Sequence, residues 1–303
     1  IADSAPVKLA QALYGENWKD HFGQYAQGAL RAEDMLYILG VDDGIVLDAY
    51  YEAEIKGNLL YANDIEKTRE EYINIIKRAD LISINIGGGN VTTFTGEQVD
   101  RVLRGDELVE MDWSKIGFTN AAIKELDDML DMIVLMDAMG MMDKYVPAGL
   151  QIGNPTAFAR VLVESMLYGY ASYNYYYPQV LERIREINPD AQLLILGMFN
   201  PVDDWNTTIE IDGKETFIDI GGIVSNVMAT ANLQNLAYAL MNDNTTFVDI
   251  GEAETILDDK VEKGEAEYSF TAYYTSILEG DGEDAHASVD GHAYMFDQMY
   301  SAL

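Results

Sequence analysis

The chain has 303 residues, 49% of them hydrophobic, so it can bury a substantial core as one large α/β domain or as two smaller ones. Its 52 acidic residues against 19 lysines and arginines give a formal net charge of -33, and a surface of that sign repels nucleic acids and anionic membranes. Cysteine is absent, which excludes disulfides, thiolate nucleophiles and cysteine-ligated metals.

No uninterrupted apolar run reaches the roughly 18 residues that a membrane-spanning helix needs, because acidic residues break even the methionine-rich stretch 123–142. We therefore predict no transmembrane segment. The chain begins at Ile1 rather than at Met, which indicates that a segment upstream has been processed or left out. We expect a secreted or cell-surface protein of a Gram-positive bacterium. The sequence does not indicate an oligomeric state.

The first elements in chain order are short. Apolar residues at helical spacing predict a helix over residues 6–13. Residues 22–28 are predicted as a short strand that enters a turn at Gly28. A second helix is expected over residues 31–39, where Met35, Leu36 and Leu39 share one face.

The next elements place a glycine loop after a buried strand. Residues 63–77 predict a helix with Asn63 as its N-cap. The β-branched run Leu81–Ile86 predicts a strand, and it ends in the loop Gly87–Asn90. This order is typical of a parallel sheet that presents a site at the carboxyl edge of its strands.

The pattern of helix followed by strand occurs twice more. Residues 156–187 and 222–241 are predicted as helices, and residues 192–198 and 245–249 as the strands that follow them. Three such units without a long linker predict one α/β domain over residues 1–303, built on a doubly wound parallel sheet.

Two segments, at about 94–150 and 203–218, do not follow this order of helix and strand, and we interpret them as insertions. The first contains a methionine-rich amphipathic helix over residues 121–145, which either packs over the core or forms one wall of an acyl pocket. The second contains a hairpin over residues 207–217 that turns at Asp212 and Gly213.

The C-terminal region carries the residues best suited to acid–base chemistry. His286 lies just after Glu283 and Asp284 and just before a terminal helix. A general base for acyl transfer needs an imidazole with one nitrogen facing the nucleophile and the other held by a carboxylate. Gly28 and Asn90 each follow a strand-like segment, where a backbone N–H and a side-chain amide can point at a developing oxyanion. Individually, these two residues are at least as well explained as a turn glycine and a helix cap.

The order of these motifs resembles the SGNH (GDSL-like) hydrolase superfamily over nearly the whole chain. The stretch Ala79–Asn90 resembles the family's block of glycines followed by the oxyanion-hole asparagine. The stretch Gln27–Asp34 resembles the block whose glycine N–H is the second oxyanion donor. The run Asp284–His292 resembles the last block, which holds the catalytic acid and base, and Leu181–Asp190 is also typical of these proteins.

The resemblance implies a three-layer α/β/α, flavodoxin-like fold and hydrolysis of carboxylic esters through a seryl acyl-enzyme. His286 is then the base, Asp284 orients its ring, and Gly28 and Asn90 form the oxyanion hole. Neither a cofactor nor a metal is implied, and the substrate is a small-molecule, lipid or acylated-carbohydrate ester, as for an esterase, a lipase or a carbohydrate acetylesterase. The chain departs from the family pattern at Val91, where Asp is usual, and at Ala287, where Pro is usual. The family's acid most often lies three positions before the base, which is Glu283, but the stretch aligns best with Asp284.

The nucleophile is the largest departure. Family members open with a strand that ends in Gly-Asp-Ser and a loop before the first helix, whereas Asp3 and Ser4 lead directly into the predicted helix. Ser4 is either the nucleophile or a helix cap. In the second case the first strand and its serine lie upstream of Ile1, and the chain is a fragment or a variant without activity.

Other chemistries find less support in the sequence. Three histidines and no cysteine leave few metal ligands; we interpret His21 as a surface or partly packed residue and His292 as a structural hydrogen-bonding residue. Gly87–Gly89 lacks the lysine of a phosphate-binding loop. The tyrosines between 168 and 177 indicate either a half-buried helix face or a carbohydrate-stacking surface. The alternative to an esterase is a catalytically inactive binding or cell-surface module that keeps the hydrolase fold.

Overall fold

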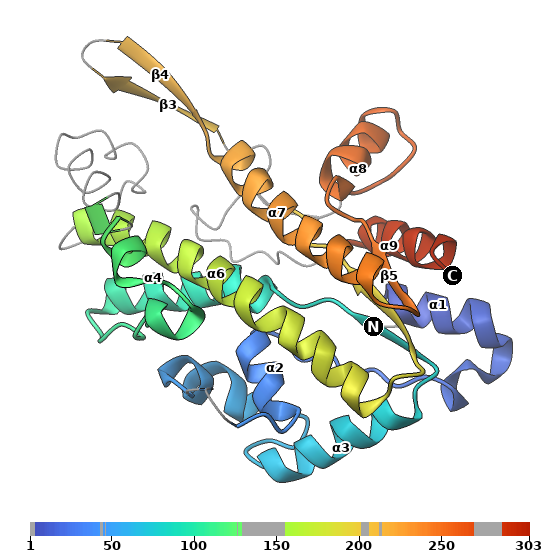
Figure 1. The fold of residues 1–303 in the computed structure, drawn as a ribbon. Helices are drawn as coiled ribbons and strands as arrows, with labels where there is room; N and C mark the ends of the chain where they lie inside the picture. Colours follow the sequence, from blue (N-terminus) through green and yellow to red (C-terminus); the bar gives the residue numbers. More distant parts are fainter. Residues whose placement is uncertain are drawn as a thin grey trace.

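The computed structural model describes residues 4–42, 45, 47–125, 127–128, 155–200, 206–211, 214–269 and 287–303. These residues are mostly helical, and their strands form a three-stranded parallel sheet and a separate two-stranded hairpin (Figure 1). The parallel sheet has the order β1-β2-β5, in which β1 spans Leu81–Ile84, β2 spans Gln192–Leu196 and β5 spans Thr245–Val248. The predicted α/β class therefore agrees with the structure, although the sheet is small.

Most of the described residues lie in helices. The α-helices are α1 (Ala5–Tyr14), α2 (Ala32–Ile38), α3 (Ile65–Arg78), α4 (Phe94–Arg104), α6 (Pro155–Ile187), α7 (Ile220–Met241), α8 (Ala253–Glu262) and α9 (Val289–Ser301). Short 3-10 or π-type segments are η1 (Gly15–Asp20), η2 (Tyr51–Ile55), η3 (Lys56–Asn58), η4 (Gly89–Thr93) and η5 (Trp113–Ile116). The hairpin strands are β3 (Asn206–Ile211) and β4 (Lys214–Asp219).

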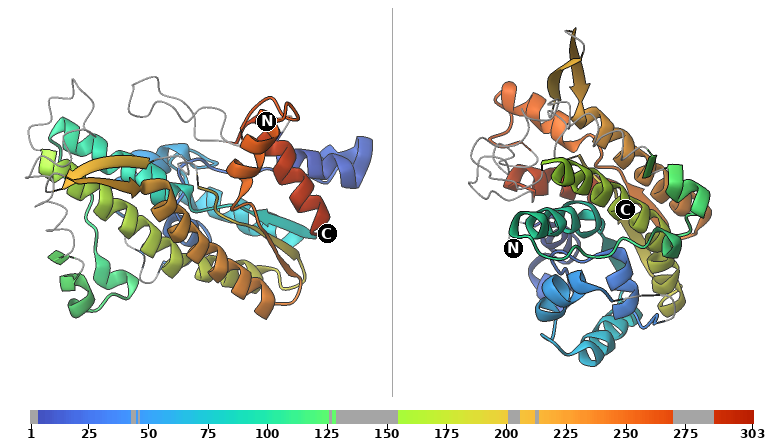
Figure 2. Two further views of the ribbon diagram at one scale, coloured as in Figure 1. Left: turned by 90° about the horizontal axis from the view of Figure 1, so that it is seen from above. Right: turned by 90° about the vertical axis from the view of Figure 1, so that its left-hand side faces the viewer.

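Helices cover both faces of the parallel sheet. Successive side chains of a strand point to opposite faces, and those of β2 alternate between two apolar clusters. Leu193 and Ile195 belong to the larger cluster, to which α2, α3 and α6 contribute. Leu194 and Leu196 belong to a second cluster with α1, α8 and α9. Figure 2 shows α1 and α9 side by side at one end of the molecule. The three strands of the parallel sheet thus lie between two groups of helices.

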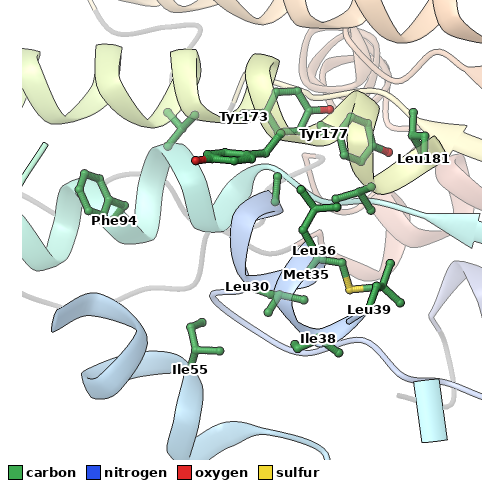
Figure 3. Packing of buried hydrophobic residues seen from close by; sticks show 14 of the residues in the cluster. Leu30, Met35, Leu36, Ile38, Leu39, Ile55, Phe94, Tyr173, Tyr177 and Leu181 are labelled. Atoms are coloured by element: carbon green, nitrogen blue, oxygen red, sulfur yellow. The ribbon is translucent and has the colours of Figure 1, made fainter. Parts of the chain in front are cut away.

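The tyrosine-rich part of α6 lies in the core. Tyr173 and Tyr177 are fully buried and stack with their ring centroids 4.7 Å apart. Figure 3 shows both rings, with Leu181, on the side of α6 that faces Leu36 of α2. The Tyr173 hydroxyl also accepts a hydrogen bond from Asn235 of α7 at 2.9 Å. These two tyrosines therefore pack the core and are not available to stack on a carbohydrate.

A proline within α6 gives rise to a second hydrogen bond between α6 and α7. Pro178 has no N–H, so the carbonyl of Asn174, four residues earlier, loses its partner within the helix. The side chain of Gln234 on α7 donates to that carbonyl at 2.9 Å. A backbone hydrogen bond that is missing within α6 is therefore replaced by a side-chain hydrogen bond from α7.

The strand predicted over residues 22–28 does not form. Residues 22–27 form no regular secondary structure, a turn follows at Gly28 and Ala29, and no strand in the described part of the chain pairs with this segment. The carbonyl of Tyr25 instead accepts a hydrogen bond from the Tyr72 hydroxyl of α3. Extended backbone becomes a strand only when a neighbouring strand satisfies its N–H and C=O groups.

The predicted cap of α3 is displaced by one residue. Asp64, not Asn63, is the N-cap, and its carboxylate accepts the N–H of Lys67 at 3.0 Å. Asn63 has a φ of 60°, the left-handed conformation that asparagine tolerates better than most residues. Asn63 therefore makes the turn, and Asp64 begins the helix.

The two predicted insertions have different outcomes. The segment 94–150 contains α4 and η5, whose Phe94 and Trp113 rings both contact Tyr168 of α6, so this part is integral to the core. Of the methionine-rich helix, residues 120–125 and 127–128 are helical, and the remainder lies outside the described residues. The two strands of the hairpin are confirmed as β3 and β4, with Ile211 paired to Lys214, and they project beyond the N-terminal end of α7 (Figure 1). The predicted turn at Asp212 and Gly213 lies outside the described residues.

Asn188 joins two of the helix-to-strand units. Its amide nitrogen donates to the carbonyls of Ile76 and Ala79, at 2.7 and 2.9 Å, and its side-chain oxygen accepts the N–H groups of Asp190 and Ala191. We predict that Asn188→Ala lowers the free energy of unfolding by about 3 kcal/mol, because buried backbone groups lose their partners. Urea denaturation measures this change.

The matched control is Asn58→Ala. The Asn58 amide is exposed and makes one local hydrogen bond, to the carbonyl of Glu54, so its loss is expected to cost less than about 1 kcal/mol. Equal effects of the two substitutions would show that Asn188 does not hold the two units together.

Candidate active site

The loop after β1 and the turn at Gly28 are in contact at the carboxyl edge of the sheet. Gly89 lies so close to the carbonyls of Ala29 and Leu30 that a Cβ atom would overlap them. On its other side, this loop is approached by α6 at Gly169, where a Cβ atom would overlap the carbonyl oxygen of Asn90. The two segments predicted to supply the oxyanion donors are therefore packed against each other with backbone atoms in contact.

Asn90 is fully buried within this packing. Its side-chain oxygen accepts the N–H of Ala32 at 2.8 Å, and its amide nitrogen donates to Glu33 Oε2 at 2.8 Å. An asparagine amide carries two hydrogens. One of these hydrogens is donated to Glu33, so only the other could be donated to an oxyanion.

Gly28 is exposed, in contrast to Asn90. It lines a cavity of about 550 Å³ together with residues 24–27, Leu60 of the loop before α3, and Thr93 of the segment after Asn90. The Gly28 turn is held in place by Tyr50, whose hydroxyl donates to the Ala29 carbonyl at 2.7 Å. The structure therefore provides an open space beside the predicted oxyanion glycine.

Ser4 occupies the N-cap position of α1, but its side chain does not cap the helix. The hydroxyl is buried and has no hydrogen-bond partner within the described residues. The neighbouring N–H of Ala5 donates to Nδ1 of His292 on α9, at 3.5 Å. This bond agrees with the structural role predicted for His292, and it joins the start of α1 to the first turns of α9. His21, as predicted, is a surface residue, and it stacks on Tyr14.

The predicted base and both candidate acids, His286, Asp284 and Glu283, lie outside the described residues. The chain is described again from Ala287, which packs against the same apolar cluster as Ala5. Ser288 then caps α9: its hydroxyl accepts the Gly291 N–H at 2.9 Å and donates to the Ser269 carbonyl at 2.6 Å. The position of the imidazole relative to Ser4 and Asn90 stays a prediction.

A buried guanidinium, which the sequence analysis did not single out, lies next to these loops. Arg31 precedes α2 and is only 2% exposed. Two of its nitrogens donate to the two oxygens of Asp34, at 2.9 and 3.1 Å, and two donate to those of Asp48, both at 2.9 Å. The guanidinium carbon also lies 4.3 Å from the centroid of the Tyr50 ring, a cation–π contact. Such two-pronged, charge-assisted pairs have well-defined geometry.

Glu33 connects this guanidinium to Asn90. Its Oε1 lies 3.4 Å from Nη1 of Arg31 and accepts the hydroxyl of Ser172 on α6 at 3.0 Å, while Oε2 accepts the Asn90 amide. All four side chains are buried. The Asn90 amide is therefore oriented by two hydrogen bonds, one to Glu33 of this charged cluster and one from the backbone N–H of Ala32. One sequence feature could have indicated this cluster. Three charged residues, Arg31, Glu33 and Asp34, lie among apolar ones shortly after the glycine turn.

The cluster has unusual protonation properties. Burial raises the pKa of the Asp34 carboxyl to about 6, and repulsion from Glu33 and Asp48 adds to this effect; the attraction and hydrogen bonds of Arg31 offset it only in part. Burial alone would lower the pKa of Arg31, but Asp34 and Glu33 raise it well above its ordinary value. Arg31 therefore stays charged, and Asp34 takes up a proton more readily than an exposed aspartate.

No protein-family model and no curated protein matches the chain. A function can therefore be proposed only from the chain's own residues and structure. Within the described ranges, no group of three histidine, aspartate or glutamate side chains is arranged to hold a metal ion. The helices of these ranges are also too short or too polar to span a bilayer.

We predict that stability depends on pH through Asp34. The folded chain binds this proton more tightly than the unfolded chain, whose ordinary pKa is 3.8, so the contribution to stability is complete below about pH 4 and is lost as the pH rises through 6. A displacement from 3.8 to about 6 corresponds to about 3 kcal/mol. The difference in unfolding free energy between the parent protein and Asp34→Asn should change by about this amount between pH 4 and 7, because the amide does not titrate.

The pKa of Asp34 can also be measured directly, without a variant. The ¹³C resonance of the Asp34 carboxyl, followed by NMR in the parent protein, should titrate with a midpoint near pH 6. A midpoint below about pH 4.5 would contradict the prediction, whatever the variant does to folding.

Proposed function

We propose that the protein hydrolyses carboxylic esters through a seryl acyl-enzyme, as its resemblance to SGNH hydrolases implies. The observation that carries the proposal is the packing of the Gly28 turn against the Asn90 loop at the carboxyl edge of a parallel sheet. Two hydrogen-bond donors of the kinds that stabilise a tetrahedral oxyanion, a backbone N–H and an amide, thus come from adjoining segments.

In the proposed reaction, His286 removes the proton of the serine hydroxyl as its oxygen attacks the ester carbonyl. The electron pair of the carbonyl moves to its oxygen, which Gly28 and Asn90 stabilise. His286 then gives its proton to the departing alcohol, and water releases the acid from the acyl-enzyme by the same steps. Asp284 or Glu283 orients the imidazole. The serine is Ser4 or one upstream of Ile1.

The charge of the molecule narrows the class of substrate. With a net charge of -33, the protein repels anionic esters and favours neutral or cationic ones. Acetylated polysaccharides, small acyl esters and uncharged lipids fit this condition. Secretion or display on the cell surface of a Gram-positive bacterium, where such esters are met, belongs to the same proposal.

One observation supports the alternative, a binding or cell-surface module without activity. Both polar atoms of the Asn90 side chain are bonded within the protein, and the residue is fully buried. A purely structural asparagine has these same properties. The two functions are separated by whether the protein forms a covalent adduct with a serine-directed reagent.

The decisive experiment treats the protein, with any residues that precede Ile1 in its natural form, with a fluorophosphonate probe and with p-nitrophenyl acetate. We expect one labelled serine, identified by peptide mapping, and turnover that rises as the pH passes about 6.5, the ordinary pKa of histidine. His286→Ala should reduce both by at least about 100-fold. Absence of labelling would leave the binding module as the better assignment.

The contact of Glu33 with Asn90 gives a second prediction. Glu33→Gln should lower kcat by about tenfold with little change in KM, because the Asn90 amide loses the carboxylate that orients it toward the transition state. Asp48→Asn is the matched control: it also removes a carboxylate from Arg31, but Asp48 makes no hydrogen bond to Asn90. Equal losses of kcat in the two variants would mean that Glu33 acts only through the charge balance at Arg31.

A further inference from the structure

The outer face of α7 is free of charge, which is unusual in this chain. None of the 22 residues Ile220–Met241 is acidic or basic, although 23% of the whole chain is charged. One side of the helix is buried, with Met228, Ala231 and Tyr238 in or against the core. The exposed residues on the other side are Ser225, Asn226, Ala229, Thr230, Leu233, Leu236, Ala237, Leu240 and Met241.

Large apolar side chains are concentrated at the C-terminal end of this face. Leu233, Leu240 and Met241 are 64%, 79% and 77% exposed. All three lie within nine positions of one helix, and exposed apolar side chains gathered on one surface commonly mark an interaction site. In Figure 1, α7 lies along the outside of the molecule, with α6 and β5 on its inner side.

The spacing of the exposed residues is that of a helix–helix seam. Asn226, Thr230, Leu233, Ala237 and Leu240 follow one another at intervals of four, three, four and three residues. This is the alternation by which one helix packs along another, with larger side chains entering the spaces beside smaller ones. The Thr230 hydroxyl is bonded to the Asn226 carbonyl of its own helix, so it leaves no hydroxyl that needs a partner in an apolar contact.

We propose that α7 pairs in antiparallel fashion with α7 of a second copy of this chain, forming a two-fold symmetric dimer. The seam is self-complementary about Leu233. In that register Leu233 meets Leu233 of the other copy, Ala237 meets Thr230, and Leu240 meets Asn226. A two-fold axis requires this reciprocity, because the same patch serves both copies.

The self-complementary spacing is the reason to assign a second copy as the occupant, and charge explains why the contact would lie on α7. Two chains that each carry a net charge of -33 repel one another strongly. The repulsion is weakest where the facing surfaces carry no charge, and α7 offers such a face over about 21 Å between residues 226 and 240. One helix pair buries less than a standard interface, so we expect dissociation constants in the micromolar range, and dimerisation that strengthens when salt screens the remaining charges.

The first experiment measures mass in solution by light scattering coupled to gel filtration, from about 10 to 200 μM protein. The mass should rise with concentration and with added salt toward twice the 33.8 kDa of one chain. Leu233→Lys should abolish this rise. Leu108→Lys is the matched control, because Leu108 is an exposed leucine outside α7 and its replacement should leave the rise unchanged.

The second experiment tests the register and uses the absence of cysteine from the chain. With a single Leu233→Cys substitution, mild oxidation should link two copies rapidly through the residue nearest the axis, as seen on a non-reducing gel. Leu108→Cys should not become linked at the same rate. A chain that stays monomeric at 200 μM in high salt, a dimer that Leu233→Lys does not affect, or equal linking at both cysteines would each overturn the proposal.

Discussion

The candidate site depends on the pairing of one buried cation with carboxylates from several segments. The Arg31 guanidinium binds Asp34 of α2 and Asp48 of the following loop, and lies beside Glu33. Removing one member of a buried pair leaves an uncompensated charge, which in other proteins costs about 3–5 kcal/mol. This constraint ties the start of α2 to the segment that carries Asp48, and through Glu33 it reaches the Asn90 loop. The polar cluster therefore contributes directly to the position of the Asn90 amide.

The two glycines at this edge make the cluster possible. Gly89 and Gly169 allow the Gly28 turn, the Asn90 loop and α6 to approach closely enough for Glu33 to bond both Asn90 and Ser172. A side chain at either glycine would push these segments apart. The same closeness places the positive charge of Arg31 beside the carboxylate of Glu33, so the two charges largely cancel next to Asn90.

Much of the fold could be predicted from the sequence, because apolar periodicity depends on local order along the chain. The helices α1, α2, α6 and α7 and the strands β1, β2 and β5 all lie within a few residues of their predicted positions. The strand expected at residues 22–28 was wrong because strand formation depends on a partner that local sequence does not reveal.

The site was less predictable for a related reason. The Gly28 and Asn90 segments were identified by their place after strand-like runs, and they do lie together. The roles of Glu33 and Ser172 arise from contacts between residues 139 positions apart, which no local pattern encodes. The predicted acid and base lie in residues 283–286, outside the described part of the chain, so their positions remain predictions from the sequence.

The topology of the parallel sheet affects how the chain folds as it is made. Leu81 pairs with Gln192, a separation of 111 residues (192 minus 81), and Leu193 pairs with Thr245. While α2, α3 and β1 emerge from a ribosome, Tyr173, Tyr177 and Leu181, which will cover Leu36, have not yet been synthesised. The apolar residues in the first third of the protein therefore remain exposed until α6 has been synthesised. Nascent chains that stall in this interval would bind chaperones or aggregate.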